Sequence, residues 1–253
     1  MRTIIIFTAL KEKIRQKVFF ISAAIGIFIL MLVTTGGASI SIGGVAVTDY
    51  RMLAPILLLL VNAISCALAV ITGLGTIPNE YERRTSHLIW IRGVSQAKYH
   101  GFLVAANILS AMLSELILYL AVFIYMLQQG HGADIWRIPP SYCICTLSVC
   151  IISLLTGWLS VLLPRYVAGT ISAFVMIAGI LYSVLDLAKN ILGGFSGKML
   201  GCLLYIIPDL NGIQAQAGNI LTGADVDIHI LLKGLFFAYI FLMLLFFTKK
   251  KET

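Results

Sequence analysis

Charged residues are scarce in this sequence. Asp, Glu, Lys and Arg make up 11% of its 253 residues, whereas hydrophobic residues make up 60%. A soluble globular domain carries about 25% charged residues. A soluble domain of useful size is therefore excluded, and lipid must be the solvent for most of the chain. At about 20 residues per membrane-spanning helix, the length leaves room for five to seven spans.

The residues that build metal and catalytic centres are also few and scattered. The chain has four histidines, none inside a long apolar run, and no H-E-x-x-H motif. Its five cysteines form no C-x-x-C pair, so we interpret them as structural. Intramembrane metalloproteases need His and carboxylate clusters at helical spacing to hold zinc. The sequence therefore predicts no catalytic residue, no metal site and no enzyme.

A phosphate-binding loop is missing as well. The nearest match is the segment GGFSGKM at 193–199, where the pattern would need Gly at Leu192 and Ser or Thr at Met199. The net charge of +7 could suggest a nucleic acid as partner. Cytoplasmic loops of membrane proteins are rich in Lys and Arg, which accounts for this charge without one.

Six apolar runs are long enough for membrane-spanning helices. They cover about 18–35, 53–77, 101–127, 142–163, 167–187 and 230–247. Residues 188–228 are predicted to form an extracellular loop with a short re-entrant or interfacial piece. Thirteen of the eighteen Lys and Arg residues then lie on the side of the N-terminus, so both termini are expected in the cytoplasm. The predicted fold is a single all-α membrane domain, 1–253, with six transmembrane helices.

Residues 1–17 have the pattern of an amphipathic helix at the membrane surface. Phe7, Leu10 and Ile14 recur at helical spacing. Basic residues, among them Lys11 and Lys13, cover the rest of the helix. We therefore expect the lysines on the polar face and the apolar stripe in the lipid headgroup region.

The stretch PNEYERRTSHLIWIRGVSQAKYH at 78–100 interrupts the apolar pattern between the second and third spans. It combines carboxylates, arginines and a patch of large apolar residues, and Gly93 is a typical helix stop. Ser95 can cap the helix that follows. Such an amphipathic element held between two membrane helices is predicted to be a cytoplasmic docking surface.

This stretch resembles the segment between spans 2 and 3 in permease subunits of type-2 ATP-binding-cassette (ABC) transporters. Members carry a carboxylate-rich turn, Gly-Thr, a hydrophobic patch, Pro-Val-Ser and a basic residue. The matching positions here are Glu80, Glu82, Thr85, Leu88, Val94, Ser95 and Lys98, whereas Arg84 replaces the usual Gly and Gly93 the usual Pro. IIPDLNGIQ at 206–214 is similar to the family's Pro-Asn-aromatic segment, and residues 1–17 are similar to its elbow helix.

The resemblance implies a permease subunit of an ABC exporter in a bacterial cytoplasmic membrane. Its partners would be two copies of an ABC ATPase, which supply ATP and Mg, and a second permease chain, identical or related. The chain itself would bind no cofactor. Its cargo would be a peptide such as an antimicrobial peptide, a lipid or a drug. The residues implied to form the coupling helix that docks on the ATPase are Glu80, Glu82, Arg83, Arg84, Thr85, Leu88, Trp90 and Arg92.

A polar stripe crosses the third apolar run. Asn107, Ser110 and Ser114 share one helical face, and Glu115 lies at its edge. The stripe either joins helices through hydrogen bonds or lines a translocation path. Two other functions stay open for the chain. One is a secondary transporter with Glu115 as its proton or ion site, and the other is a membrane scaffold that transports nothing.

Overall fold

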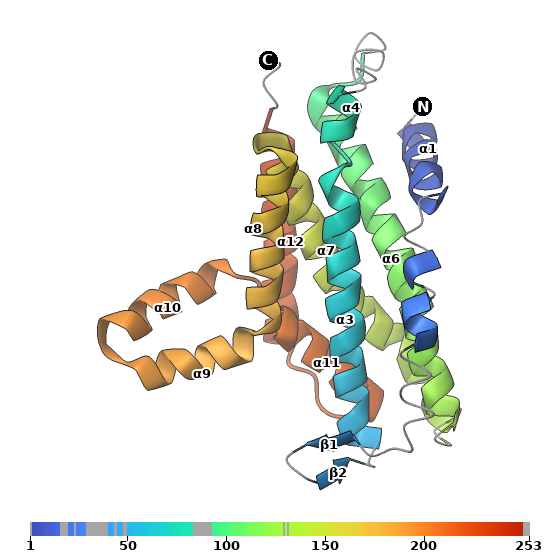
Figure 1. The fold of residues 1–253 in the computed structure, drawn as a ribbon, viewed down its shortest axis with the longest axis vertical. Helices are drawn as coiled ribbons and strands as arrows, with labels where there is room; N and C mark the ends of the chain where they lie inside the picture. Colours follow the sequence, from blue (N-terminus) through green and yellow to red (C-terminus); the bar gives the residue numbers. More distant parts are fainter. Residues whose placement is uncertain are drawn as a thin grey trace.

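The chain folds into a helical bundle (Figure 1). The computed structural model describes residues 2–15, 20–22, 24–28, 40–42, 45–47, 50–82, 93–128, 130 and 132–249. The helices are α1 (Arg2–Arg15), α3 (Tyr50–Leu74), α4 (Pro78–Glu82), α6 (Gln96–Gln128), the 3-10 helix η1 (Gly132–Arg137), α7 (Ile138–Leu162), α8 (Arg165–Ile180), α9 (Tyr182–Leu192), α10 (Gly194–Ile206), α11 (Leu210–Thr222) and α12 (Ile228–Phe247). The short strands β1 (Ile40–Ile42) and β2 (Val45–Val47) pair antiparallel. The predicted all-α class is confirmed for the described residues, apart from this hairpin.

Four helical stretches in the described part of the chain are long and apolar enough to cross a membrane. They are Leu53–Glu82, Gln96–Gln128, Asp134–Leu162 and Ile228–Phe247. A fifth results if α8 and α9 count as one bent span. The structure thus supports a helical chain with four or five apolar spans, whereas the sequence predicts six. Most of the run at 18–35 lies outside the described residues, although 20–22 and 24–28 are helical.

The apolar run at 167–187 is not one straight helix. α8 ends at Ile180, and the axis turns by 74° into α9. Close packing accompanies the bend, because a Cβ on Gly179 would lie 2.7 Å from the carbonyl oxygen of Pro208. α9 and α10 then form a hairpin that projects sideways from the bundle (Figure 1). The sequence predicts one spanning helix at 167–187, without this bend.

The predicted loop 188–228 is also mostly helical. Its apolar piece belongs to α10, and α11 packs against α3 and α7. α11 begins where the Asp209 side chain accepts a hydrogen bond of 2.7 Å from the backbone N–H of Gly212. This N-cap satisfies one of the unpaired donors of the first helical turn.

Helices α3, α6 and α7 form the centre of the bundle, and small residues set their spacing. A Cβ on Gly157 of α7 would lie 2.5 Å from Cγ2 of Val104 on α6. On α8, a Cβ on Gly169 would lie 2.9 Å from the Leu74 side chain. These glycines therefore allow close helix contacts, as expected of small residues in apolar helices.

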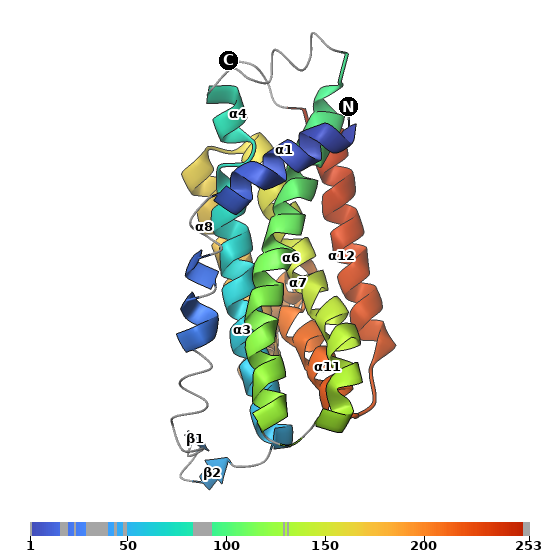
Figure 2. The same cartoon turned by 90° about the vertical axis from the view of Figure 1, so that its right-hand side faces the viewer.

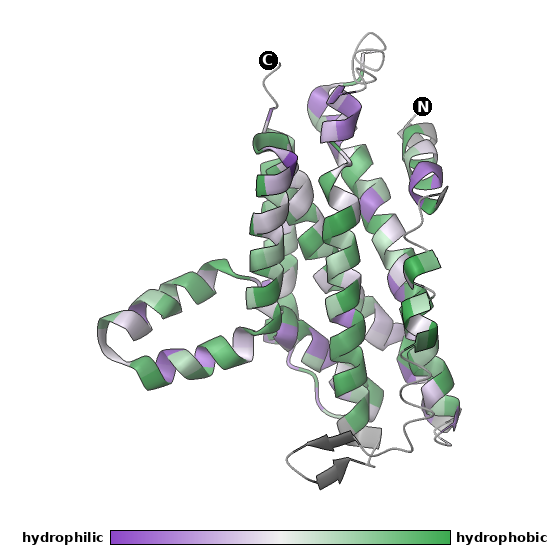
Figure 3. Cartoon of the chain, viewed as in Figure 1, coloured by the Kyte–Doolittle hydropathy of each residue, from purple (hydrophilic) through white to green (hydrophobic). Residues whose placement is uncertain are grey.

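The two ends of the bundle differ. α1 lies across α6 at the end that also holds α4, the beginning of α6 and the last residues of α12 (Figures 1 and 2). β1, β2 and the end of α6 lie at the opposite end. Hydrophilic residues gather at the α4 end, whereas the long helices are mostly hydrophobic along their length (Figure 3).

Candidate functional site: a polar junction at the base of residues 83–92

The predicted docking segment is described at its two ends. Glu80 and Glu82 lie on α4, and residues 93–95 lead into α6. The other residues of the predicted docking set lie outside the described residues, namely Arg83, Arg84, Thr85, Leu88, Trp90 and Arg92. Gly93 has a φ of 76°, the left-handed conformation that glycine adopts most easily.

Side chains of α4 and the first turns of α6 join these two ends. The Tyr99 hydroxyl donates a 2.6 Å hydrogen bond to Oε2 of Glu80. Nε2 of Gln96 donates a 2.7 Å bond to the Tyr81 hydroxyl, which also lies 2.8 Å from Nε2 of His100. Residues 96, 99 and 100 share one face of α6 because they are three and four positions apart. We call these three contacts the clamp; they fix residues 82 and 93 relative to one another.

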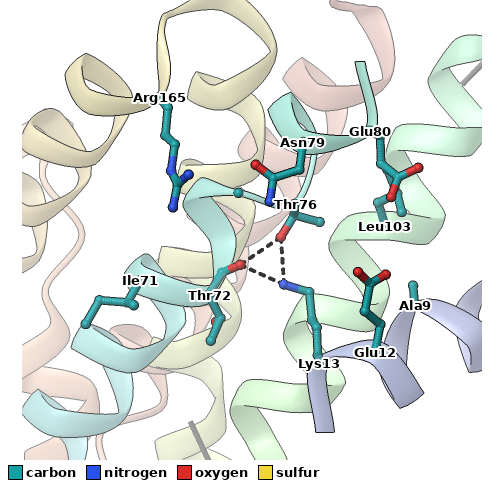
Figure 4. Close-up of a pocket in the computed structure, with 11 residues that line it drawn as sticks. Ala9, Glu12, Lys13, Ile71, Thr72, Thr76, Asn79, Glu80, Leu103 and Arg165 are labelled. Carbon is teal, nitrogen blue, oxygen red and sulfur yellow. Dashed lines mark hydrogen bonds between the residues drawn. The ribbon is translucent and has the colours of Figure 1, made fainter. Parts of the chain in front are cut away.

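Lys13 of α1 lies beside the clamp and is almost completely buried, with 7% of its surface exposed. Its Nζ donates to the Thr72 carbonyl oxygen at 2.6 Å, to Oγ1 of Thr76 at 2.8 Å and to Oδ1 of Asn107 at 3.0 Å. Figure 4 shows the contacts with Thr72 and Thr76. Because an ammonium group has three donors, every donor of Lys13 is used.

Burial also changes the acid–base behaviour of this lysine. It lowers the pKa of Lys13 from 10.5 to about 8, and the charge of the neighbouring Glu12 offsets a part of this shift. The charged form is disfavoured in a place with little water. The three acceptors around Nζ stabilise the ammonium group there.

A small polar cavity of about 110 Å³ connects these elements (Figure 4). It is lined by α1, the end of α3, α4, α6 and the first residue of α8, with Glu12, Lys13, Asn79, Glu80 and Arg165 as its main polar side chains. We call this cavity and the hydrogen bonds of Lys13 the junction. At this cavity α4 meets α1, α3, α6 and α8, whose helices belong to the bundle.

The face that α1 presents to the bundle differs from the expected one. The sequence places Lys13 on the polar face of an amphipathic helix, whereas the structure buries it. Phe7 and Ile14 of the apolar stripe are instead 73% and 43% exposed. The reason is the set of oxygen acceptors on α3 and α6, which a helical wheel of residues 1–17 does not contain. The outward apolar side chains remain free to contact lipid.

The predicted stripe on α6 is divided between two environments. Asn107, Ser110, Ser114 and Glu115 are all buried, with at most 1% exposed. Asn107 belongs to the junction through Lys13. The polar side-chain atoms of the other three residues have no hydrogen-bond partner within the described ranges.

No protein family matches the chain, and no curated protein is similar to it in sequence. Within the described ranges, no three His, Cys, Asp or Glu side chains gather as they would around a metal ion. What these contacts can do is mechanical: the Lys13 bonds join α1 to the end of α3 and to α6, and the clamp joins α4 to α6.

Proposed function

We propose that this chain is the membrane-spanning permease subunit of an ABC exporter. It would pair with a second permease chain in a bacterial cytoplasmic membrane, and each permease would dock on one copy of a separate ABC ATPase. The ATPase would bind ATP and Mg, since the sequence contains no phosphate-binding loop. The cargo would be a peptide, lipid or drug that crosses at the interface between the two permeases.

The clamp is the observation that carries this proposal. A permease without its own nucleotide site needs force from a partner, and that force must enter through a defined surface. Glu82 and Gly93, which flank 83–92 in the sequence, are close in sequence to the bonds that tie Glu80 to Tyr99 and Tyr81 to His100. A partner that moves this segment would therefore move the ends of α3 and α6 together, as rigid-body motion requires.

The outer surface of the bundle fits a lipid environment. Large hydrophobic side chains are exposed along α8 and α12, including Phe174 at 69% and Phe236 at 61%. Soluble monomers rarely expose such extended apolar surface. On this proposal lipid covers most of it, and the second permease chain covers the remainder.

The test is co-purification of the tagged chain from its native membrane. We expect an ABC ATPase in stoichiometric amount, and we expect its loss when Leu88→Glu and Trp90→Glu are combined, because large apolar residues anchor interfaces. Trp136→Glu is the matched control, since Trp136 is 67% exposed on η1, which precedes α7 at the end of the bundle opposite α4. All variants should insert and be recovered in equal amounts.

Other results would change the assignment. An ATPase retained by the double variant would show that 83–92 is not the docking segment. Recovery of the folded chain alone would favour the secondary transporter with Glu115 as its proton or ion site. An associated ATPase that no substrate stimulates would favour the scaffold.

A further inference from the structure

Glu115 lies in the interior of the bundle, away from the junction. None of its surface is exposed, and neither carboxyl oxygen has a hydrogen-bond partner among the described residues. It is eight residues beyond Asn107 on α6, or about 12 Å along the helix axis. Lys13, which bonds to Asn107, is therefore too far away to pair with Glu115.

Helices α3 and α7 contribute uncharged polar groups at the level of Glu115. Asn107 contacts the carbonyl oxygen of Ala69 on α3, and α3 and α6 run in opposite directions (Figure 2). Glu115 follows Asn107 by eight residues on α6, and Asn62 precedes Ala69 by about as many residues on α3. Because the two helices are antiparallel, Asn62 lies at the level of Glu115. On α7, Ser148 lies between two cysteines that are within range of the charge of Glu115.

These neighbours supply no counter-charge. Nδ2 of Asn62 and Oγ of Ser114 and Ser148 are buried and have no hydrogen-bond partner in the part of the chain that the structure describes. Among the described residues, the titratable groups within range of the charge of Glu115 are thiols and phenols, namely Cys66 on α3, Tyr119 on α6, and Tyr142, Cys145 and Cys150 on α7. Thiols and phenols are neutral at physiological pH. A carboxylate buried among them would keep its full desolvation penalty.

A proton neutralises the carboxyl more readily here than a metal ion does. Oxygens that share one sodium ion lie close to one another, because each must lie within bonding distance of the ion. No described side chain lies within hydrogen-bonding reach of either Glu115 oxygen, so its neighbours form no such cage. A proton needs only the carboxyl itself.

We propose that Glu115 is a proton-binding site, occupied in this closed arrangement of α3, α6 and α7. When the helices separate and water enters, the carboxylate is solvated and the proton leaves to that water. Closure then takes up one proton from solution. The site adds proton binding and release to the conformational cycle of the chain, and it depends only on the bundle, not on the ATPase proposed above.

The first test is chemical labelling of the full chain in its native membrane with a hydrophobic fluorescent carbodiimide. This reagent adds to protonated carboxylic acids, and labelled peptides are mapped by mass spectrometry. A solvated glutamate is protonated in fewer than about one molecule in a thousand at pH 7.5, so we expect Glu115 to label at least about tenfold faster than the exposed Glu82. Glu115→Gln should abolish this label, and Glu82→Gln should leave it unchanged.

The second measurement does not depend on access of the reagent. The infrared carbonyl band of a protonated carboxyl should be present at neutral pH, absent in Glu115→Gln and unchanged in Glu82→Gln. Replacing choline chloride by sodium chloride at equal concentration should alter neither readout. Absence of the Glu115 infrared band, or equally slow labelling of Glu115 and Glu82, would overturn the proposal. If sodium protected Glu115 from the carbodiimide, this result would overturn the proposal too, because a metal ion would then occupy the site. Mapping of the wild-type peptides assigns the label even if the glutamine variant fails to fold.

Discussion

The junction predicts that substitutions at Lys13 and at Asn107 have coupled effects on the stability of the fold. Lys13→Met removes the ammonium group and keeps an unbranched side chain, while Oδ1 of Asn107 loses its donor. Asn107→Leu removes this acceptor instead. The double variant leaves neither a buried cation with a missing acceptor nor a buried amide oxygen with a missing donor. We therefore expect the two substitutions to be strongly non-additive.

The magnitude follows from the hydrogen bonds around Nζ. Three bonds to a charged donor contribute about 1.5–3 kcal/mol each. The lowered pKa of Lys13 corresponds to a desolvation penalty of about 3 kcal/mol at neutral pH, which offsets part of that sum. Lys13→Met should then destabilise the fold by roughly 2 kcal/mol or more. The coupling energy with Asn107→Leu should be about 2 kcal/mol, since one charge-assisted bond joins the pair.

The assay is thermal unfolding of the purified chain and the three variants in one detergent at pH 7. For a chain of this length, each kcal/mol shifts the midpoint by about 2–4 °C. The double variant should thus unfold about 4–8 °C above the temperature that additivity of the two single shifts predicts. Additive shifts would contradict the predicted coupling, because they would mean that Lys13 and Asn107 do not share a bond in the folded chain.

Three further results are expected. Tyr99→Phe should lower the unfolding midpoint by about 3–6 °C, because it removes a short bond to a carboxylate; an unchanged midpoint would contradict the clamp. Between pH 8 and 10 the unfolded chain keeps a proton on Lys13 that the folded chain has lost, so the free energy of unfolding should rise with pH relative to Lys13→Met, by up to about 3 kcal/mol. A difference that stays constant over this range would show that the folded chain keeps the proton. Gly157→Ala should cost about 1–3 kcal/mol through its collision with Val104, whose branched side chain is stiff in a helix. Gly201→Ala is its control and should cost less, because a flexible lysine is the nearest neighbour there.

Long apolar runs made much of the helical content predictable. α7 and α12 overlap the runs at 142–163 and 230–247, and an α-helix satisfies the backbone hydrogen bonds of such an apolar run within the run itself. The turn into α9 is different. Its residues remain apolar across the bend at Leu181, so hydropathy contains no signal for the change in direction. The start of α11 did carry a readable signal, since Asp209 stands three residues before the N–H that it caps.

The junction could not be found from local pattern. Lys13 bonds to partners 59, 63 and 94 positions away, so its burial is a property of the assembled bundle. A periodic pattern reports only which residues share a face of one helix, and in α1 the predicted polar face turned out to hold the buried cation. The polar stripe on α6 was visible in the sequence. The sequence did not show that this stripe divides between the junction, through Asn107, and the carboxyl of Glu115, which has no hydrogen-bond partner among the described residues.

Helix α6 connects the three features on which the proposals rest. Its first turns carry Tyr99 and His100 of the clamp, Asn107 accepts from Lys13 two turns later, and Glu115 follows after two more turns. A straight helix transmits displacement along its axis because its backbone hydrogen bonds are continuous. Any force that enters at residues 83–92 would therefore act on the Lys13 bonds and on the packing around Glu115 at the same time. Breaking the Lys13 bonds releases α1 from α6, and separating α6 from α3 and α7 admits water to the carboxyl. If both proposals hold, a partner docked at 83–92 would move α6, the same movement would admit water to Glu115, and the Lys13 bonds would hold α6 in the closed position until then.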